Sequence, residues 1–230
     1  MKTIRTLTVA LALSATAAFG AQAAETRVTS MGSTAFVSVK SYVARKFETV
    51  VKQKYDFSCG SAALATLLTY HYDRPVSEED VFDKMWAVGD QPNIRAKGFS
   101  LLDMKLYLQS VGLRADGFQL PLDKLRQIGV PTIALIVHKG YAHFVVLRGI
   151  AKDYVVLGDP ALGAVTMPRR EFEKNWNGIA FAIYNDADIA RSHFNLVRDL
   201  PVTKRADLGA ALGRQTLAAI TVLLPGRNEF

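Results

Sequence analysis

Apolar residues recur at helical spacing in the first half of the chain. From Ser58 onward, in a stretch of good helix formers, they return at intervals of three and four residues: Ala62, Ala63, Leu64, Leu67 and Leu68. This spacing predicts a buried helix that begins at about Ser58 and Cys59.

Capping signals mark three further helices. Ser77 precedes an acidic turn with an apolar stripe, and Ser100 precedes a leucine-rich segment that Gly112 would end. A short helix is predicted from Leu122 to Ile128, closed by Gly129. The first half of the chain is therefore expected to be mainly helical.

After Pro131 the pattern favours strands. The β-branched and apolar segments 132–137 and 142–150 predict two strands joined by a turn at 138–141. Further strands are predicted at 154–157, 164–167 and 179–184. A helical turn is predicted at 171–176, before the last of these strands. Helices followed by strands predict an α+β fold, in which N-terminal helices pack on an antiparallel sheet.

The N-terminus has the features of an export signal. Lys2 and Arg5 precede an uncharged, largely apolar run from Leu7 to Phe19, and Ala21-Gln22-Ala23 fits the small-x-small cleavage pattern. We therefore expect residues 1–23 to be a signal peptide and the mature protein to be periplasmic. The alternative is an uncleaved membrane anchor, although the run is shorter than the ~20 residues that span a bilayer.

Length and composition suit one well-buried domain, because half of the 230 residues are apolar and 21% are charged. We expect an N-terminal segment at 24–49, a single domain at 50–184 and a C-terminal tail at 185–230. The mostly apolar run from Leu217 to Leu224 is too short to cross a membrane. The tail therefore packs on the domain, is partly disordered, or docks on a partner or a membrane surface.

The distribution of charge excludes some partners. The formal net charge is +7, but the basic residues are scattered and form neither a stripe nor a recognisable module, so we expect no nucleic acid. The chain has no Gly-rich phosphate loop, so we expect no ATP. The four histidines are far apart in sequence and there is one cysteine, so we expect no metal and no cofactor.

The single cysteine, Cys59, carries the most specific chemical signal. It cannot close an intramolecular disulfide, so its thiol must be buried and inert, paired with another chain, or reactive. A position at a helix N-terminus favours the thiolate, because unpaired N–H groups and the helix dipole stabilise negative charge there. Gly60 is expected to let a substrate backbone approach.

A reactive thiol needs a base, an orienting group and donors to an oxyanion. His143 is predicted at the head of a strand, where it can face a helix N-terminus, whereas His71 is expected to be a solvated or partly buried spectator. Asp159 ends the next strand, and a short turn at 152–153 would bring it beside His143. Gln53, six residues before Cys59, can fold back and donate to the oxyanion.

At these positions the chain resembles the bacteriocin-processing (C39) peptidases, which are papain-like domains that remove double-glycine leaders. The similar stretches are residues 53–60, 140–147 and 157–160, within a resemblance that runs from about residue 50 to about 184. The resemblance implies a papain-like fold with Cys59 as nucleophile, His143 as base, Asp159 as its orienting carboxylate and Gln53 as oxyanion residue.

The sequence departs from the family pattern in two respects. Ser58 occupies a position where members often carry an acidic residue, and the chain has no phosphate loop or spanning helices like those of the export ATPases to which most members are fused. ATP binding and transport are therefore not expected. The chain is similar to stand-alone, exported members that are encoded with secretion systems for extracellular fibres, including functional amyloids.

The sequence thus predicts a cysteine endopeptidase that acts on an exported polypeptide, such as a leader or a fibre subunit. One alternative is a non-hydrolytic module that binds the leader or subunit, although such relatives have usually lost the cysteine. Another is a different thiol enzyme, such as an amidase or a transglutaminase-like acyl transferase. The upstream position of Gln53 favours the peptidase.

Overall fold

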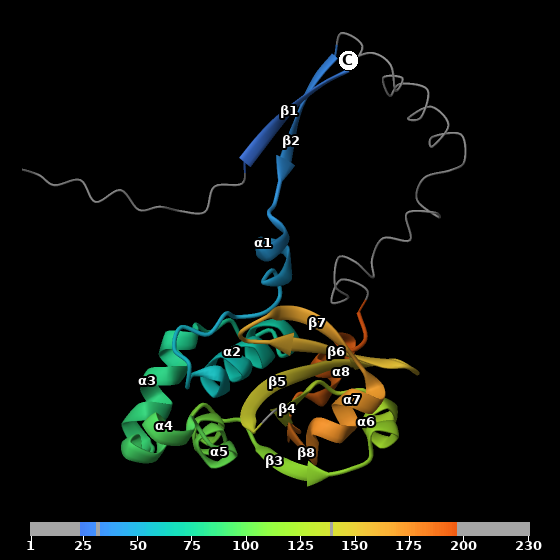
Figure 1. Cartoon of the computed structure of the whole chain (residues 1–230). Helices are drawn as coiled ribbons and strands as arrows, with labels where there is room; N and C mark the ends of the chain where they lie inside the picture. Colours follow the sequence, from blue (N-terminus) through green and yellow to red (C-terminus); the bar gives the residue numbers. More distant parts are fainter. Residues whose placement is uncertain (1–23, 31–32, 139, 197–230) are drawn as a thin grey trace, which may run out of the picture. The chain divides into compact units, whose positions relative to one another are not determined.

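The computed structural model describes residues 24–30, 33–138 and 140–196, which form parts of two compact units (Figure 1). The first unit, residues 1–41, contains an antiparallel pair, β1 (Ala24–Ser30) and β2 (Ser33–Val39). The sequence analysis expected an N-terminal segment here without this pair. The predicted signal peptide and the apolar run from Leu217 to Leu224 lie outside the described residues.

The second unit begins at residue 42 and contains the other described elements. Its helices are α1 (Tyr42–Lys46), α2 (Cys59–His71), α3 (Glu78–Val88), α4 (Gln91–Lys97), α5 (Leu101–Ser110), α6 (Leu122–Ile128), α7 (Arg169–Asn175) and α8 (Ala187–Ser192). Its strands are β3 (Ala115–Gln119), β4 (Thr132–His138), β5 (Tyr141–Ile150), β6 (Tyr154–Asp159), β7 (Gly163–Pro168) and β8 (Trp176–Ile183). No helix in the described part of the chain is long and apolar enough to cross a membrane.

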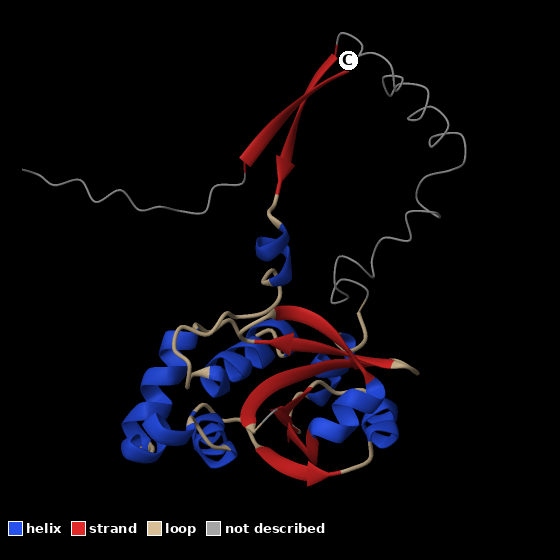
Figure 2. Cartoon of the chain, in the orientation of Figure 1, coloured by secondary structure: helices blue, strands red, loops and turns tan. Residues whose placement is uncertain are grey.

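The strands of the second unit, drawn in red in Figure 2, form one six-stranded antiparallel sheet. Their order is β3-β8-β4-β5-β6-β7. Successive side chains of a strand point to opposite faces, and β5 is buried on both. Phe144 and Val146 join the core beneath α2, whereas Val145 and Leu147 join a second core beneath α6 and α7. The predicted packing of helices on an antiparallel sheet is confirmed.

Local sequence signals account for several of the helix ends. The Ser77 hydroxyl accepts a hydrogen bond from the N–H of Asp80, and Ser100 forms a reciprocal capping box with Asp103. Gly129 ends α6 with a left-handed backbone, at φ 69°. These predicted ends are confirmed, whereas the sequence analysis did not predict α4, β3 or α8.

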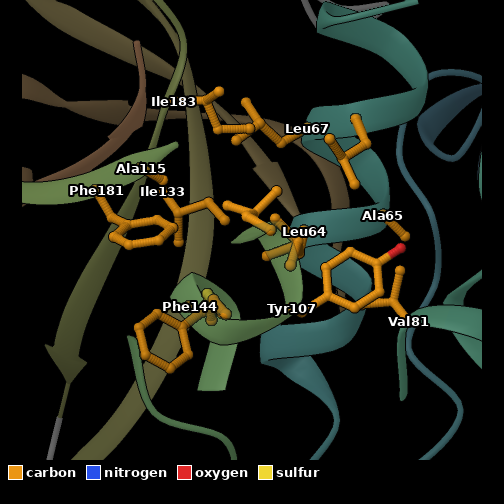
Figure 3. Packing of buried hydrophobic residues seen from close by; sticks show 14 of the residues in the cluster. Leu64, Ala65, Leu67, Val81, Tyr107, Ala115, Ile133, Phe144, Phe181 and Ile183 are labelled. Atoms are coloured by element: carbon orange, nitrogen blue, oxygen red, sulfur yellow. The ribbon is translucent and has the colours of Figure 1, made fainter. Parts of the chain in front are cut away.

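Helix α2 forms the centre of the larger core (Figure 3). Its residues Leu64 and Leu67 are fully buried and lie against Ile133, Phe181 and Ile183 of the sheet. Because α2 is buried almost all round, its N-terminal end is fixed relative to β4, β5 and β8. The position of Cys59 is therefore set by the core.

Gly60 serves helix packing. A Cβ at this position would lie 3.0 Å from Met104 Cε and 3.0 Å from Phe99 Cβ, both in the protein interior. The absence of a side chain therefore lets α2 approach α5. The expectation that Gly60 makes room for a substrate is wrong.

Candidate active site

Cys59 is the first residue of α2 and is 6% exposed. Ser58, which precedes it, makes no side-chain hydrogen bond to the first turn of the helix. The Ser58 hydroxyl instead contacts Tyr55, accepting from its N–H at 3.1 Å and lying 3.0 Å from its carbonyl oxygen. The start of α2 thus keeps backbone N–H groups for an anion at Cys59.

His143 and Asp159 lie side by side on adjacent strands. Strands β5 and β6 pair antiparallel with Val146 opposite Gly158, which brings the start of β5 to the end of β6. Nε2 of His143 lies 2.9 Å from Oδ1 of Asp159, and both side chains are about nine-tenths buried. The hairpin predicted from the sequence accounts for this contact.

The Asp159 carboxylate is held by its own turn. Its Oδ1 also accepts hydrogen bonds from the backbone N–H groups of Ala161, at 2.8 Å, and Leu162, at 3.0 Å. Burial raises the pKa of this carboxyl, but the bonds from His143 and from the two N–H groups lower it further, so the net pKa lies below the usual value. Asp159 is therefore a fixed anion at neutral pH.

His143 is placed to carry a proton toward Cys59. Burial lowers the pKa of the imidazole, but Asp159 and Cys59 outweigh burial and raise it to about 9. The second ring nitrogen, Nδ1, is buried and has no hydrogen-bond partner at standard geometry among the described residues. Asp159 occupies Nε2, so Nδ1 is the ring nitrogen left to exchange a proton with Cys59, whose side chain contributes to the raised pKa of His143.

Gln53 lies in the segment that leads into α2 and is joined to the turn of Asp159. Its backbone N–H donates to the Pro160 carbonyl at 3.0 Å. Its side-chain Nε2 donates to the Tyr55 carbonyl at 3.0 Å, and its buried Oε1 has no partner among the described residues. An amide nitrogen carries two hydrogens, so Nε2 keeps one for a further acceptor.

Tyr141 also belongs to this group, although the sequence pattern placed it in the turn at 138–141 and not in the strand where it lies. Its ring stacks on that of His143, with ring centres 6.1 Å apart and planes 28° apart. Its hydroxyl donates to the Asp56 carbonyl at 3.1 Å. The spacing of two residues from His143 on one strand was a usable signal, because such residues share a face.

His71 lies at the end of α2 opposite Cys59. It is completely buried, its Nε2 accepts a hydrogen bond from Nε of Arg148 at 3.1 Å, and its Nδ1 donates to the His193 carbonyl at 3.1 Å. A guanidinium only donates and a carbonyl only accepts, so these bonds fix a neutral ring. The sequence predicted a solvated or partly buried side chain, whereas His71 is fully buried in the interior.

Cys59, His143 and Asp159, with Gln53 near by, lie where the start of α2 meets the edge of β5 and β6. A helix-borne thiol, a strand-borne imidazole and a carboxylate behind it, on this arrangement of helices and antiparallel sheet, define the class of papain-like cysteine peptidases. In the described part of the chain, no group of three or more His, Cys, Asp or Glu side chains is placed to hold a metal ion.

Comparison with known proteins gives the family. The model of the Peptidase C39 family matches residues 48–188, and the chain belongs to this family. It is 44% identical over 155 residues to a Pseudomonas fluorescens protein named "Probable functional amyloid protease FapD", covering 67% of this chain and 69% of the relative. A protein of the same name from Pseudomonas aeruginosa is 45% identical over 152 residues, covering 66% and 67%.

A solved structure supports the fold. The peptidase domain of Streptococcus ComA, a bi-functional ABC transporter involved in quorum sensing, superposes with a TM-score of 0.51 at 20% identity, covering 59% of this chain and 96% of that domain. The expected papain-like fold and C39 resemblance are confirmed. The chain is a cysteine peptidase, and its substrate is a polypeptide.

Proposed function

We propose that this peptidase is exported and cleaves an exported polypeptide, either a leader or a fibre subunit of a functional-amyloid type of secretion system. The similarity to two functional amyloid proteases supports the substrate class. The basic n-region and apolar run of residues 1–23 support export to the periplasm. The membrane-associated or partner-docking role considered for the tail stays a prediction, because its apolar run lies outside the described residues.

In the proposed reaction, Cys59 is the nucleophile. Its thiolate attacks the carbonyl carbon of the scissile bond, and the resulting oxyanion accepts hydrogen bonds from the Cys59 N–H and from Nε2 of Gln53. His143, protonated at Nδ1, gives its proton to the leaving amine as the C–N bond breaks. The product is a thioester between Cys59 and the N-terminal part of the substrate.

A water molecule completes the cycle. His143, now neutral, takes a proton from the water as its oxygen attacks the thioester carbonyl. The C–S bond breaks, the product leaves as a carboxylic acid that loses its proton to solvent, and the thiolate and the protonated imidazole are restored. Asp159 does not react; it orients the ring through Nε2 and stabilises its positive charge.

The contact between His143 and Asp159 carries this proposal. It uses Nε2 and therefore leaves Nδ1 as the ring nitrogen that can serve the only thiol of the chain, at the N-terminal end of α2. Burial of both side chains excludes water from the pair and strengthens their attraction.

The experiment is a digestion with candidate substrates. The chain without residues 1–23 is incubated with the exported polypeptides encoded beside its gene, and the products are identified by mass spectrometry, with Cys59→Ala as control. A single cut made only by the parent protein supports the proposal. Tight binding without a cut would instead favour the non-hydrolytic alternative, and a cut made equally by Cys59→Ala would remove Cys59 as nucleophile.

A further inference from the structure

Tyr141 bridges the two sides of the active site. Its backbone lies at the start of β5, two residues before His143, and its ring stacks on the imidazole. Its hydroxyl reaches the segment before α2, where it donates to the Asp56 carbonyl. The side chain is 57% exposed, so burial of the ring does not by itself explain why it adopts this position.

We propose that Tyr141 is a positioning residue of the peptidase reaction, with its ring aligning His143 and its hydroxyl holding the turn that follows Gln53. This inference deepens the proposed function and rests on it. The two parts of the side chain thus act on different groups and are separable by substitution.

The ring has a specific task at His143. The bond from Nε2 to Asp159 fixes one atom of the imidazole but leaves the ring free to pivot about that bond. An aromatic ring packed against one face restricts the pivot, because offset stacking has a preferred geometry. Nδ1 is then kept in the direction of Cys59, which stabilises the thiolate.

The hydroxyl has its task at the turn. Asp56 follows Tyr55, and the Tyr55 carbonyl is the group to which Nε2 of Gln53 donates. A bond to the Asp56 carbonyl therefore restrains the peptide next to the one that orients the oxyanion donor. Partial burial and the nearby Cys59 and Asp56 raise the pKa of the Tyr141 phenol, so the hydroxyl keeps its proton and continues to donate.

Two substitutions separate the tasks. Tyr141→Phe keeps the ring over His143 and loses the bond to Asp56, whereas Tyr141→Leu loses both. Two measurements are made on each variant: the rate at which iodoacetamide alkylates Cys59 at neutral pH, which needs no substrate, and kcat and KM for peptide cleavage.

We expect Tyr141→Phe to alkylate at the parent rate and to lose about 2- to 10-fold in kcat, the range for one neutral hydrogen bond, with KM unchanged. Tyr141→Leu should lose about 10- to 100-fold in kcat, since it also loses the stacking, and its alkylation should be slower than that of the parent. Tyr184→Leu is the matched control, because Tyr184 is 47% exposed and adjoins Ile183, whose carbonyl binds Tyr72 at the opposite end of α2. It should leave both measurements unchanged.

The outcomes distinguish this inference from the proposed function. Parent-like kcat and alkylation in Tyr141→Leu would overturn the positioning role, as would equal losses in Tyr184→Leu. If Tyr141→Leu lowers the melting temperature, the more conservative Tyr141→Phe decides: an unchanged kcat in a fully folded Phe variant overturns the role of the hydroxyl. If no exported polypeptide is cut by the parent but alkylation is slower in Tyr141→Leu alone, the proposed substrate class fails and the alignment of His143 stands.

Discussion

Nε2 of His143 lies 2.9 Å from an oxygen of Asp159 that two backbone N–H groups also hold. The carboxylate is thus fixed before it meets the imidazole, and the imidazole takes its orientation from the carboxylate. The same contact, together with Cys59, raises the pKa of His143 to about 9, so Asp159 affects both the orientation and the ionisation of the base.

Replacement of Asp159 by Asn should move the alkaline limit of activity. Asp159 raises the pKa of His143, so its loss lowers that pKa, and the protonated imidazole required by the leaving group disappears at a lower pH. The alkaline limb of the kcat/KM profile should lie near pH 9 in the parent and at a lower pH in Asp159→Asn. The variant should keep a residual rate of cleavage. The measurement is a pH–rate profile of both proteins, and an unmoved limb would show that Asp159 does not tune the base.

Loss of the thiol or the base should abolish turnover while the fold survives. Cys59→Ala and His143→Ala remove reacting groups at the edge of the core and leave α2 and the sheet packed. Circular dichroism and thermal unfolding check the fold, and peptide cleavage checks activity.

In the parent, iodoacetamide should modify Cys59 faster than it modifies a model thiol, and this modification should inactivate the enzyme. Labelling only after unfolding would indicate an inert core cysteine.

Replacement of Gln53 by Ala should act on the transition state. Removal of one oxyanion donor typically costs roughly 10²- to 10³-fold in kcat, and substrate affinity should change little. Steady-state kinetics of Gln53→Ala and Gln53→Glu separate the two effects, since Glu keeps the shape of the side chain and loses the donor. A rise in KM at constant kcat would instead place Gln53 in substrate binding.

Gly60→Ala should destabilise the fold. The added methyl would lie 3.0 Å from Met104 and from Phe99, so the interior must shift, at a typical cost of about 1–3 kcal/mol. Chemical denaturation measures this loss. In a Met104→Ala background, itself destabilised, the further loss caused by Gly60→Ala should be smaller, because the longer side chain that meets the new methyl is then gone.

Substrate specificity should follow the size of the residues before the scissile bond. If the resemblance to double-glycine peptidases extends to this cleft, bulky residues in place of a Gly-Gly or Gly-Ala pair should block cleavage by steric exclusion. A series of peptides that differ at these two positions tests this expectation by mass spectrometry. Efficient cleavage after large residues would contradict this specificity. If Gln53→Ala were still impaired on those peptides, the proposed mechanism would stand.

Local patterns predicted those parts of the molecule that depend on neighbouring residues. The periodicity after Ser58 predicted α2, and the turn at 152–153 predicted the meeting of His143 with Asp159. Helix α4 was missed because seven residues that include Pro92 carry little periodic signal.

Contacts between distant residues were not predictable in this way. The burial of His71 depends on Arg148 and His193, which lie 77 and 122 residues away in sequence. The position of Tyr141 depends on Asp56, 85 residues earlier. The helix that carries His71 was predicted correctly, whereas Tyr141 was predicted in the turn before its strand, and only the packed structure shows what either side chain contacts.

The strand that carries His143 depends at its other end on residues beyond the family match. Asn195 donates its N–H to the Arg148 carbonyl at 3.0 Å, and its side-chain oxygen accepts from the Ile150 N–H at 2.8 Å, where β5 and β6 change register. The family match ends at residue 188. A chain cut there would leave both backbone groups without these partners, at a cost of about 1–3 kcal/mol for each one left buried and unpaired. The folding unit of this peptidase therefore extends at least through Asn195.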